Sequence, residues 1–550
     1  MTRTDTVITE DALNRLDQHW AVKALGGDRI ARALEVAAVR VMRAAVGRQI
    51  AIAFDETATD AETVERAAMA YEVAAIEGLD ALLHPSGDET RVHLRLQAQA
   101  GAFRAYALRR TLLIPQGRPE DRIFHVLHLA ALAYCGDQWA DVRRWLKDHE
   151  RKVKPPSVAD VCWDHRLLRR LYECWVRLLR KQGWDDLDGI REIIAGLRKD
   201  QEQYENAALD KPDNASAQAA SLRLIALYHW AKATELLAVY MLQGQPVGIE
   251  AELDKHFEAG RQAASVAQDA ALEVILRWLH ATSRRMVAGS LWKVAQAVNS
   301  RVTRFVKSIT RTRSMFELLP PQRAALQEQG LLDQASRAVV VDLPTSGGKT
   351  TLAQFRMLQA LNQFDADKGW VAYVAPTRAL VSQLTRRLRE DFSPLDIRVE
   401  QLTGAVEIDA FEEAMLTAQS EVVPFHVLVS TPEKLQLVIR NKKVSRPLAL
   451  VVMDEAHSIE DEERGLRIEL LLATIKRECD RANFLLLMPN VPNADDLARW
   501  LGADAGKTIS IGTSPWQPNE RAVGLFSAVE DKSVRGGWKL QYETLITTPK

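Results

Sequence analysis

The second half of the sequence alternates between short β-branched runs and longer helical stretches, and this alternation constrains the fold most. The runs are almost continuously apolar, which is typical of strands buried on both faces of a parallel sheet. Such sheets carry helices on both faces and bind ligands at the carboxyl ends of their strands. The expected strands are AVVV (338–341), WVAYV (370–374), FHVLV (425–429), LALVVM (448–453), FLLLM (484–488) and TISI (508–511), with helices between them, for example at 351–364 and 495–502.

The first 300 residues follow a different pattern, in which apolar residues recur every three or four positions. Between Trp163 and Leu179, leucines and Trp175 share one face of an expected helix, and arginines take the other face. Pro, Gly and Asp interrupt this pattern at 84–89, 115–121, 153–157 and 208–216, where helices are expected to end.

These two patterns predict a multidomain protein. We expect an all-α helical region over residues 1–300, followed by an α/β domain with a mostly parallel sheet over residues 301–550. The helical region would form two sub-bundles, over about 1–150 and 151–300. A solenoid-like stack of paired helices is one possible arrangement, although the sequence has no recognisable fixed repeat.

Composition narrows the class of protein. Of the 550 residues, 47% are hydrophobic and 26% are charged, which is typical of globular domains and excludes a disordered chain. No run of 18 uncharged apolar residues occurs, and the N-terminus lacks the apolar stretch of a secretory signal. The four cysteines are far apart and form no CxxC pair, so a disulfide framework is not expected. We predict a cytoplasmic protein with no membrane partner.

Two groups of residues in the helical region have the side-chain types of metal ligands. They are His125 with His128, and Cys162 with His165 and Cys174. All of them lie among apolar residues at helical spacing, and no fourth ligand is evident. The pattern favours core packing over a metal site.

A basic stretch from Val274 to Phe316 contains no Asp or Glu. A strip of this kind can neutralise the phosphates of a nucleic acid. The alternatives are a solvated helix face or a surface that docks on an acidic domain. Its cations are Arg277, Arg284, Arg285, Lys293, Arg301, Arg304, Lys307, Arg311 and Arg313.

The segment LPTSGGKT (343–350) lies directly between an expected strand and an expected helix. Gly347 and Gly348 let the backbone fold tightly, so that its N–H groups point inward at phosphate oxygens. Lys349 can reach the β- and γ-phosphates, and the Thr350 hydroxyl can hold Mg²⁺. The candidate nucleotide-binding residues of this loop are Thr345, Ser346, Gly347, Gly348, Lys349 and Thr350.

Two adjacent carboxylates end the apolar strand in LALVVMDEAH (448–457). Asp454 would engage Mg²⁺, and Glu455 would orient and deprotonate an attacking water. A capped strand end is the structural alternative, but the phosphate loop upstream favours the catalytic interpretation. The candidate catalytic residues are therefore Lys349, Asp454 and Glu455, with Thr350 and Asp454 as metal ligands.

These motifs, together with VAPTRAL (374–380) and STPEKL (430–435), occur in the order of superfamily-two DExH-box helicases. The sequence resembles this family over about residues 315–530, and the run DEAHSIEDEERGLRIE (454–469) looks closest to the superkiller-type subgroup. That subgroup includes RNA-exosome helicases and archaeal DNA-repair helicases. The resemblance implies a P-loop domain that is the first RecA-like lobe of a helicase, with ATP and Mg²⁺ as cofactors and ATP hydrolysis as the reaction.

The resemblance also implies roles for residues outside the two central motifs. Gln322, in LLPPQRAAL (318–326), would pair with the adenine edge, and His457 would couple hydrolysis to nucleic-acid binding. The residues implied to lie along a single-strand backbone are Pro376, Thr377, Arg378, Thr403, Gly404, Thr431 and Pro432. Each of them could instead form a turn or a helix cap.

Two departures from the family pattern limit this expectation. Motif III, Ser-Ala-Thr in the family, aligns with Met488-Pro489-Asn490, so the hydroxyls that link the two sites are missing. A helicase motor also needs a second sheet that supplies arginines to the γ-phosphate. No second strand–helix block precedes the last residues, ITTPK. We therefore expect the second lobe to be absent from this chain and its ATP hydrolysis to be weak.

Three functions are compatible with these features. The first is one lobe of a helicase or translocase that couples Mg-ATP hydrolysis to engagement of single-strand DNA or RNA, in bacterial genome defence or repair. Its partners would be single-stranded or duplex nucleic acid, and a protein bound by the helical region. That extension resembles those of bacterial anti-phage defence helicases. The alternatives are a nucleotide-regulated nucleic-acid or protein binding module without unwinding activity, and a helical scaffold with a vestigial ATPase.

Overall fold

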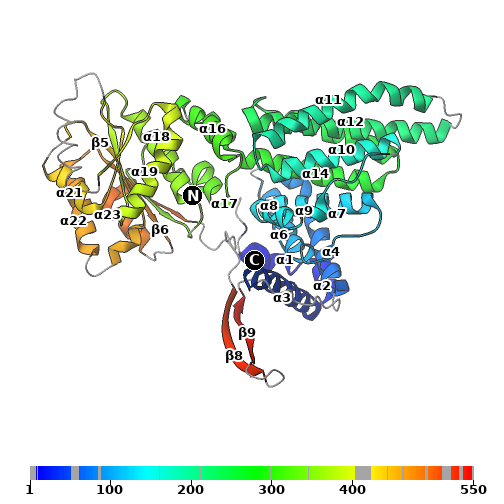
Figure 1. Ribbon diagram of the computed structural model, residues 1–550, viewed down its shortest axis with the longest axis horizontal. Coiled ribbons are helices and arrows are strands. Elements are labelled where there is room, and N and C mark those ends of the chain that lie inside the picture. Colours follow the sequence, from blue (N-terminus) through cyan, green and yellow to red (C-terminus); the bar gives the residue numbers. More distant parts are fainter. Residues whose placement is uncertain are drawn as a thin grey trace.

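The helical half and the sheet occupy opposite sides of the molecule in the computed structural model (Figure 1). Both patterns seen in the sequence are therefore confirmed as a helical region followed by an α/β domain. The structure describes residues 8, 10–50, 61–84, 88–159, 161–209, 214–297, 299–344, 346–402, 423–441, 444–460, 464–489, 493–510, 522–531 and 537–547.

The helices of the first 300 residues are interrupted where the sequence predicts breaks. Asp88 and Asp269 accept hydrogen bonds from backbone N–H groups at the starts of two of these helices, which satisfies donors that the helix leaves free. None of the described helices is long and apolar enough to cross a bilayer. The helices are α1 (Glu10–Leu16), α2 (Trp20–Leu25), α3 (Gly27–Ile50), α4 (Ala61–Glu77), α5 (Leu79–Leu83), α6 (Glu89–Arg109), α7 (Pro119–Cys135), α8 (Trp139–Asp148), α9 (Glu150–Val153), α10 (Trp163–Arg180), α11 (Trp184–Leu209), α12 (Asn214–Gln243), α13 (Ile249–Val266), α14 (Ala270–Gly289), α15 (Leu291–Ala297) and α16 (Ser300–Arg313).

Of the candidate ligands named in the sequence, Cys174 is buried and His125 and His128 are half-buried, but Cys162 is exposed and is not packed in a core. The Nε2 atom of His128 lies 3.4 Å from a carboxylate oxygen of Glu72, and its ring stands edge-on to Trp278. Burial lowers the pKa of His125 to about 4, so its ring is neutral at pH 7. Cys174 is fully buried in α10.

The potential ligand atoms of Cys162, Asp164 and His165 lie within 4.8 Å of one another at the start of α10. The carboxylate of Asp164 already accepts a hydrogen bond of 2.8 Å from Arg223. The Nδ1 atom of His165 lies 2.9 Å from a carboxylate oxygen of Glu120. Both side chains therefore have partners within the protein.

A seven-stranded sheet with the order β3-β4-β2-β5-β6-β1-β7 forms the centre of the α/β domain, and every strand pair in it is parallel. This is the RecA-like arrangement that the resemblance implied. The strands are β1 (Ala338–Asp342), β2 (Trp370–Val374), β3 (Val399–Leu402), β4 (Val427–Ser430), β5 (Leu448–Met453), β6 (Asn483–Met488) and β7 (Gly506–Ser510). The helices around it include α17 (Pro320–Arg323), α18 (Lys349–Gln363), α19 (Arg378–Phe392), α21 (Pro432–Arg440), α22 (Gly465–Glu478) and α23 (Ala494–Gly502).

Alternate residues of each strand belong to two different cores. Val339 and Val341 of β1 face the core that contains α18 and α19, whereas Val340 faces the core beneath α21, α22 and α23. Because both faces are covered, most positions of the central strands are apolar, which explains the nearly continuous apolar runs. The first of these cores continues into the helical region without interruption.

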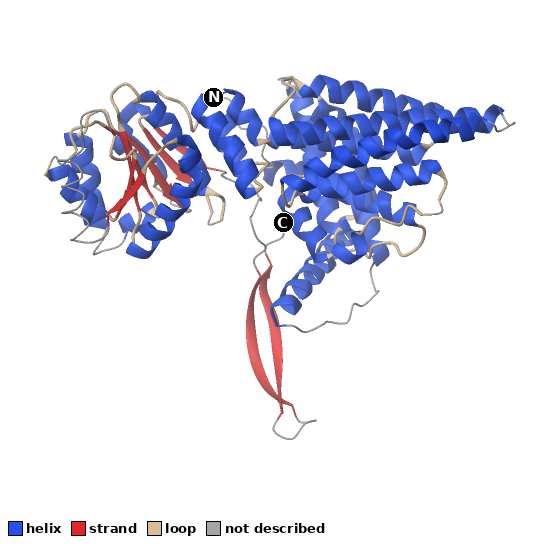
Figure 2. Cartoon of the chain, turned by 45° about the horizontal axis from the view of Figure 1, so that its top comes forward, coloured by secondary structure: helices blue, strands red, loops and turns tan. Residues whose placement is uncertain are grey.

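Two parts of the strand pattern differ from the sequence prediction. The edge strand β3 was not predicted, because its exposed Glu400 interrupts the apolar pattern. The antiparallel pair β8 (Ala522–Asp531) and β9 (Gly537–Thr547) forms a separate sheet that projects from the rest of the chain (Figure 2). The described part of the RecA-like sheet therefore ends at Ser510, within the predicted range 301–550. The division at residue 300 remains a prediction.

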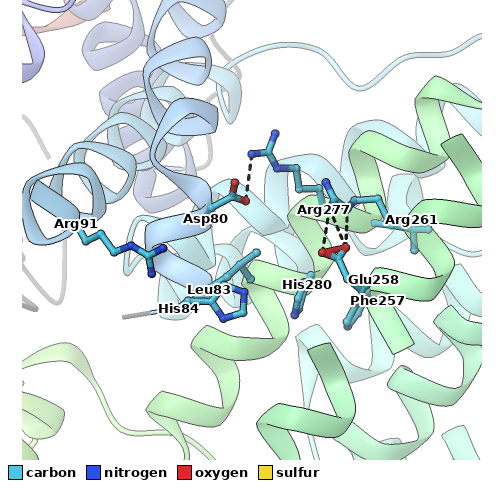
Figure 3. Close-up of a pocket in the computed structure, with 10 residues that line it drawn as sticks. Asp80, Leu83, His84, Arg91, Phe257, Glu258, Arg261, Arg277 and His280 are labelled. Atoms are coloured by element: carbon cyan, nitrogen blue, oxygen red, sulfur yellow. Dashed lines mark hydrogen bonds and ion pairs between the residues drawn. The ribbon is translucent and has the colours of Figure 1, made fainter. Parts of the chain in front are cut away.

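Eight of the nine cations of the basic stretch at 274–316 contact acidic groups, carbonyl oxygens or an aromatic ring of the same chain, and the ninth, Lys307, is exposed. Arg277 pairs with Asp80 across a cavity of about 270 Å³ between α5, α6, α13 and α14 (Figure 3). Further ion pairs join Arg284 to Asp254, Arg285 to Asp137, Lys293 to Glu250, Arg301 to Asp365, and Arg313 to Asp391 and Glu390. Arg284 and Arg304 also donate to carbonyl oxygens, and Arg311 lies over Trp184. The structure thus favours docking on acidic groups, here those of the same chain, over a free phosphate-binding strip.

Candidate nucleotide-binding site

Two described residues of the loop between β1 and α18 have a left-handed backbone. Ser346 has φ of 65° and Gly348 has φ of 78°. The N–H group of Gly347 donates to the carbonyl oxygen of Pro344 at 3.1 Å and closes the turn. The chain therefore turns tightly from strand to helix. The N–H groups of Lys349 and Thr350 precede the first N–H that bonds back to Gly348, that of Thr351, so they can bind an anion.

The Gln322 side chain connects α17 to this loop. Its amide oxygen accepts a hydrogen bond of 2.9 Å from the Leu319 N–H, and its Nε2 donates to the Gly348 carbonyl at 3.1 Å. Only 2% of Gln322 is exposed. One N–H and one oxygen lone pair of the amide remain beyond these two bonds, which is the pair of groups that adenine recognition would need.

Substituting Gly348→Ala is expected to weaken ATP binding by about tenfold or more. A Cβ at this position would lie 2.1 Å from Gln322 Nε2, and the positive φ disfavours any residue with a Cβ. The new methyl group would therefore push Gln322 away from the loop. The measurement is the Kd of ATP by titration calorimetry.

Gly196→Ala is the matched control for this change. Gly196 lies in α11, and an added Cβ there meets nothing within 4 Å. Alanine at this position should stabilise the helix slightly and leave the Kd of ATP unchanged. If the Gly348→Ala variant bound ATP as tightly as the wild type, ATP binding would not require Gln322 to pack on the loop.

Asp454 and Glu455 follow β5 directly. The Asp454 N–H donates to the Val374 carbonyl at 2.9 Å, which extends the strand pairing by one residue. One Asp454 carboxylate oxygen accepts from the Glu455 N–H at 3.0 Å, and the other accepts from the Tyr373 hydroxyl at 3.1 Å. Glu455 has φ of 49°, a strained conformation of the kind found at functional sites.

Lys349 lies in the field of these carboxylates. Its Nζ donates to the Leu343 carbonyl at 3.3 Å, and only 8% of the residue is exposed. Burial lowers the pKa of Lys349, whereas the charges of Glu455 and Asp454 act in the opposite direction. Burial raises the pKa of Asp454, and the charge of Glu455 raises it further. A cation and two acids thus share one partly dehydrated site, where electrostatic interactions are strong.

The residues present fit a magnesium ion. Thr350 is half-buried in the first turn of α18, and the carboxylate of Asp454 is half-buried at the end of β5. Hydroxyl and carboxylate oxygens are the ligands that Mg²⁺ takes in phosphate-binding sites. His457 lies beside the pair, with its Nδ1 atom 3.3 Å from a Glu455 oxygen.

A second group of predicted site residues lies along the same edge of the sheet. Because Val374 of β2 pairs with Ser430 of β4, the segments that follow these strands are neighbours. Thr377 caps α19 through a hydrogen bond of 3.3 Å from the Leu380 N–H, and Arg378 is exposed. The remaining members of the group are half-buried Pro376, and buried Thr431 and Pro432 at the start of α21.

Met488, which replaces the serine of motif III, is fully buried. Met488 ends β6, between β1 and β5, and pairs with Asp342 in register. Its carbonyl accepts a hydrogen bond of 3.1 Å from the Leu343 N–H at the start of the phosphate loop. Its thioether side chain has no hydroxyl that could donate a hydrogen bond.

Sequence reasoning missed Tyr373, whose hydroxyl holds Asp454. In a strand this side chain counts as apolar, and the only available signal was that a buried tyrosine hydroxyl needs a partner. Four predicted positions, Thr345, Thr403, Gly404 and Asn490, lie outside the described residues.

Comparison with known proteins agrees with this geometry. Residues 320–492 match the DEAD/DEAH box helicase family. This segment is similar to a DEAD/DEAH box helicase domain. The matched range contains Gln322, the phosphate loop, the acidic pair and the second group of site residues.

The relatives that match this segment are much longer proteins than this chain. The ATP-dependent DNA helicase Hel308 of Thermococcus kodakarensis is 30% identical over 222 residues, which cover 40% of this chain and 18% of Hel308. The Hachiman protein HamB of Bacillus cereus is 28% identical over 273 residues, which cover 48% of this chain and 23% of HamB. The crystal structure of the DUF1998 helicase MrfA bound to DNA is similar with a TM-score of 0.33 and 20% identity, over 39% of this chain and 30% of MrfA. The chain thus spans about a fifth of the length of the two curated relatives.

Proposed function

We propose that the helicase domain is the ATP-binding lobe of an ATP-dependent nucleic-acid helicase or translocase. One observation carries the proposal, namely that Lys349 lies in the field of Asp454 and Glu455 at the carboxyl edge of the sheet. A lysine after one strand and two carboxylates after another are the groups that phosphoryl transfer from a nucleotide requires. The family assignment of residues 320–492 supports the same chemistry.

Each group would have a distinct role in the reaction. Lys349 and the N-terminus of α18 would hold the phosphates, and Thr350 and Asp454 would hold Mg²⁺. The bound ion would neutralise charge that develops on the transferred phosphoryl group. Glu455 would orient the attacking water and accept its proton. The Tyr373 hydroxyl would keep Asp454 oriented toward the ion.

The nucleic acid would run along Pro376–Arg378 and Thr431–Pro432, with His457 coupling this path to Glu455. DNA is the favoured substrate, because the matched Hel308 proteins are named DNA helicases. The superkiller-type subgroup, a cytoplasmic role in genome defence or repair, and a protein partner for the helical region belong to the same proposal. The match to a Hachiman protein over 48% of the chain supports a defence role.

Met488 favours a second candidate function. Without a hydroxyl in motif III, ATP binding and strand movement would be poorly coupled. The chain would then be a nucleotide-regulated binding module that engages nucleic acid or protein without unwinding. Nucleic-acid-stimulated ATP turnover separates the two candidates, because only a coupled motor shows it.

The proposal is tested by Arg378→Ala with Arg386→Ala as its control. Both arginines are exposed on α19, but only Arg378 lies at the proposed strand path. Losing one phosphate contact should weaken single-strand binding about fivefold and reduce the salt dependence by about one unit of slope. The measurement is the Kd of a fluorescent oligonucleotide at several salt concentrations, together with ATP turnover with single- and double-stranded DNA and RNA.

Arg386→Ala should bind the oligonucleotide like the wild type. Equal losses for both variants would indicate a diffuse electrostatic effect and contradict the proposed path. Turnover that no nucleic acid stimulates would favour the binding module over the helicase.

A further inference from the structure

The segment that carries Gln322 is held by the helical region at several points. At its start, residues 316–318 run antiparallel to the end of α14. The Leu291 N–H donates to the Phe316 carbonyl at 3.1 Å, and the Leu318 N–H donates to the Gly289 carbonyl at 2.8 Å. The backbone leading to α17 is therefore fixed against a helix of the other half of the molecule.

Buried side chains add a second attachment. A Glu317 carboxylate oxygen accepts hydrogen bonds from Lys181 Nζ at 2.8 Å and from the Tyr134 hydroxyl at 3.1 Å. The side chain of Lys181 is 0% exposed and that of Glu317 is 1% exposed. Separating the segment from the helical region would leave Lys181 and Glu317 unpaired. Because an unpaired buried charge is costly, this ion pair stabilises the contact between them.

The third attachment lies next to Gln322 in the sequence. Arg323 donates two parallel hydrogen bonds to Asp137, at 3.0 and 2.8 Å, from α17 to the turn after α7. Asp137 also pairs with Arg285 of α14 at 2.5 Å and accepts from Gln99 at 2.7 Å. Burial raises the pKa of Asp137, but the two arginines outweigh it, so its pKa is lowered and the carboxylate stays charged.

Arg323 is linked to the phosphate loop through Gln322, its neighbour in the sequence. Gln322 occupies the neighbouring position in α17 and donates to the carbonyl of Gly348, the residue that precedes α18. A bidentate arginine–carboxylate pair fixes both position and orientation, so it limits how the short helix α17 can rotate. The orientation of the Gln322 amide therefore depends on Asp137, a residue of the helical region.

We infer that Asp137 and Arg323 position Gln322, so that the helical region sets the base preference of the nucleotide site. This inference rests on the proposed function, because it assumes that ATP binds at the phosphate loop and that Gln322 contacts its base. Asp137 is a positioning residue, since it acts through Arg323 and α17. The phosphates would be held by Lys349 and the N–H groups of the loop, whereas the described contacts of Asp137 and Arg323 reach the loop only through Gln322.

The test is Arg323→Met in the full chain, with titration calorimetry of ATP, UTP and inorganic tripolyphosphate. Asp137 keeps Arg285 as its partner in this variant, so the buried carboxylate stays paired. ATP affinity should fall about tenfold, the effect of losing one or two hydrogen bonds, while UTP and tripolyphosphate affinities stay within about twofold. Arg323→Lys, which keeps the charge, should restore part of the preference for ATP.

Arg285→Met is the matched control. It removes the other arginine that binds Asp137 and leaves the Arg323 pair intact, so the ratio of UTP to ATP dissociation constants should remain that of the wild type. A merely structural role of the network would lower stability in both variants and leave this ratio unchanged in both.

Three results would overturn the inference. Equal losses of ATP, UTP and tripolyphosphate affinity in Arg323→Met would indicate damage to the whole site. A change of the ratio in Arg285→Met as large as that in Arg323→Met would remove any special role of the residue beside Gln322. A wild-type chain that binds ATP without preference over UTP would refute the base contact, whereas one that binds none of the three ligands would refute the proposed function itself.

Discussion

Lys349→Ala is expected to abolish measurable ATP binding at micromolar concentrations and to reduce turnover by at least about 10²-fold. Lys349 supplies a positive charge to a site that otherwise contains Asp454, Glu455 and Asp342. Without it, three carboxylates would repel the triphosphate in a partly dehydrated environment, where the repulsion is strong. Calorimetric titration with ATP and a phosphate-release assay measure the two effects.

Lys255→Ala is the control for the loss of a lysine. Lys255 is exposed on α13, in the helical region. This variant should bind and hydrolyse ATP like the wild type. If Lys349→Ala bound ATP as tightly as Lys255→Ala, the assignment of the whole site would be wrong.

Glu455→Gln is expected to separate binding from hydrolysis. The amide keeps the shape of the side chain but cannot accept the proton of the attacking water, so turnover should fall by about 10²- to 10³-fold. The Kd of ATP should change by less than about threefold, because Lys349, Thr350 and the loop are unaltered. Trapped ATP should also tighten single-strand binding, which an oligonucleotide titration with and without ATP would reveal.

Glu469→Gln provides the matched control, since Glu469 is exposed on α22 and is not one of the candidate site residues. Its turnover should equal that of the wild type. If Glu455→Gln hydrolysed ATP at the wild-type rate, a group other than Glu455 would have to accept the proton of the attacking water.

Much of the α/β domain was predictable because its determinants are local. The continuous apolar strands required a sheet covered on both faces, and LPTSGGKT required a tight turn before a helix. The strand β3 was not predicted because its edge position allows polar residues, since an edge strand needs only part of its surface buried. The separate β8–β9 pair also went unpredicted, although Trp538, Leu540 and Tyr542 alternate with polar residues in β9.

The basic stretch shows where local reasoning was insufficient. A run of cations without acids in the sequence indicates a free positive surface only if no acids approach from elsewhere. Here the partners are far away in the chain, as with Asp80 for Arg277 and Asp365 for Arg301. Only the packing of helices against one another decides which charges remain available to a nucleic acid.

By itself, the sequence determined the two-part architecture, the phosphate loop and the acidic pair, because each depends on residue type and spacing within one short segment. The tertiary structure alone decided that Tyr373 holds Asp454, and that Asp137 holds the residue next to Gln322. These contacts join residues 81 and 186 positions apart in the chain. Such pairs form only when burial leaves a polar group without water, so that a distant partner must satisfy it.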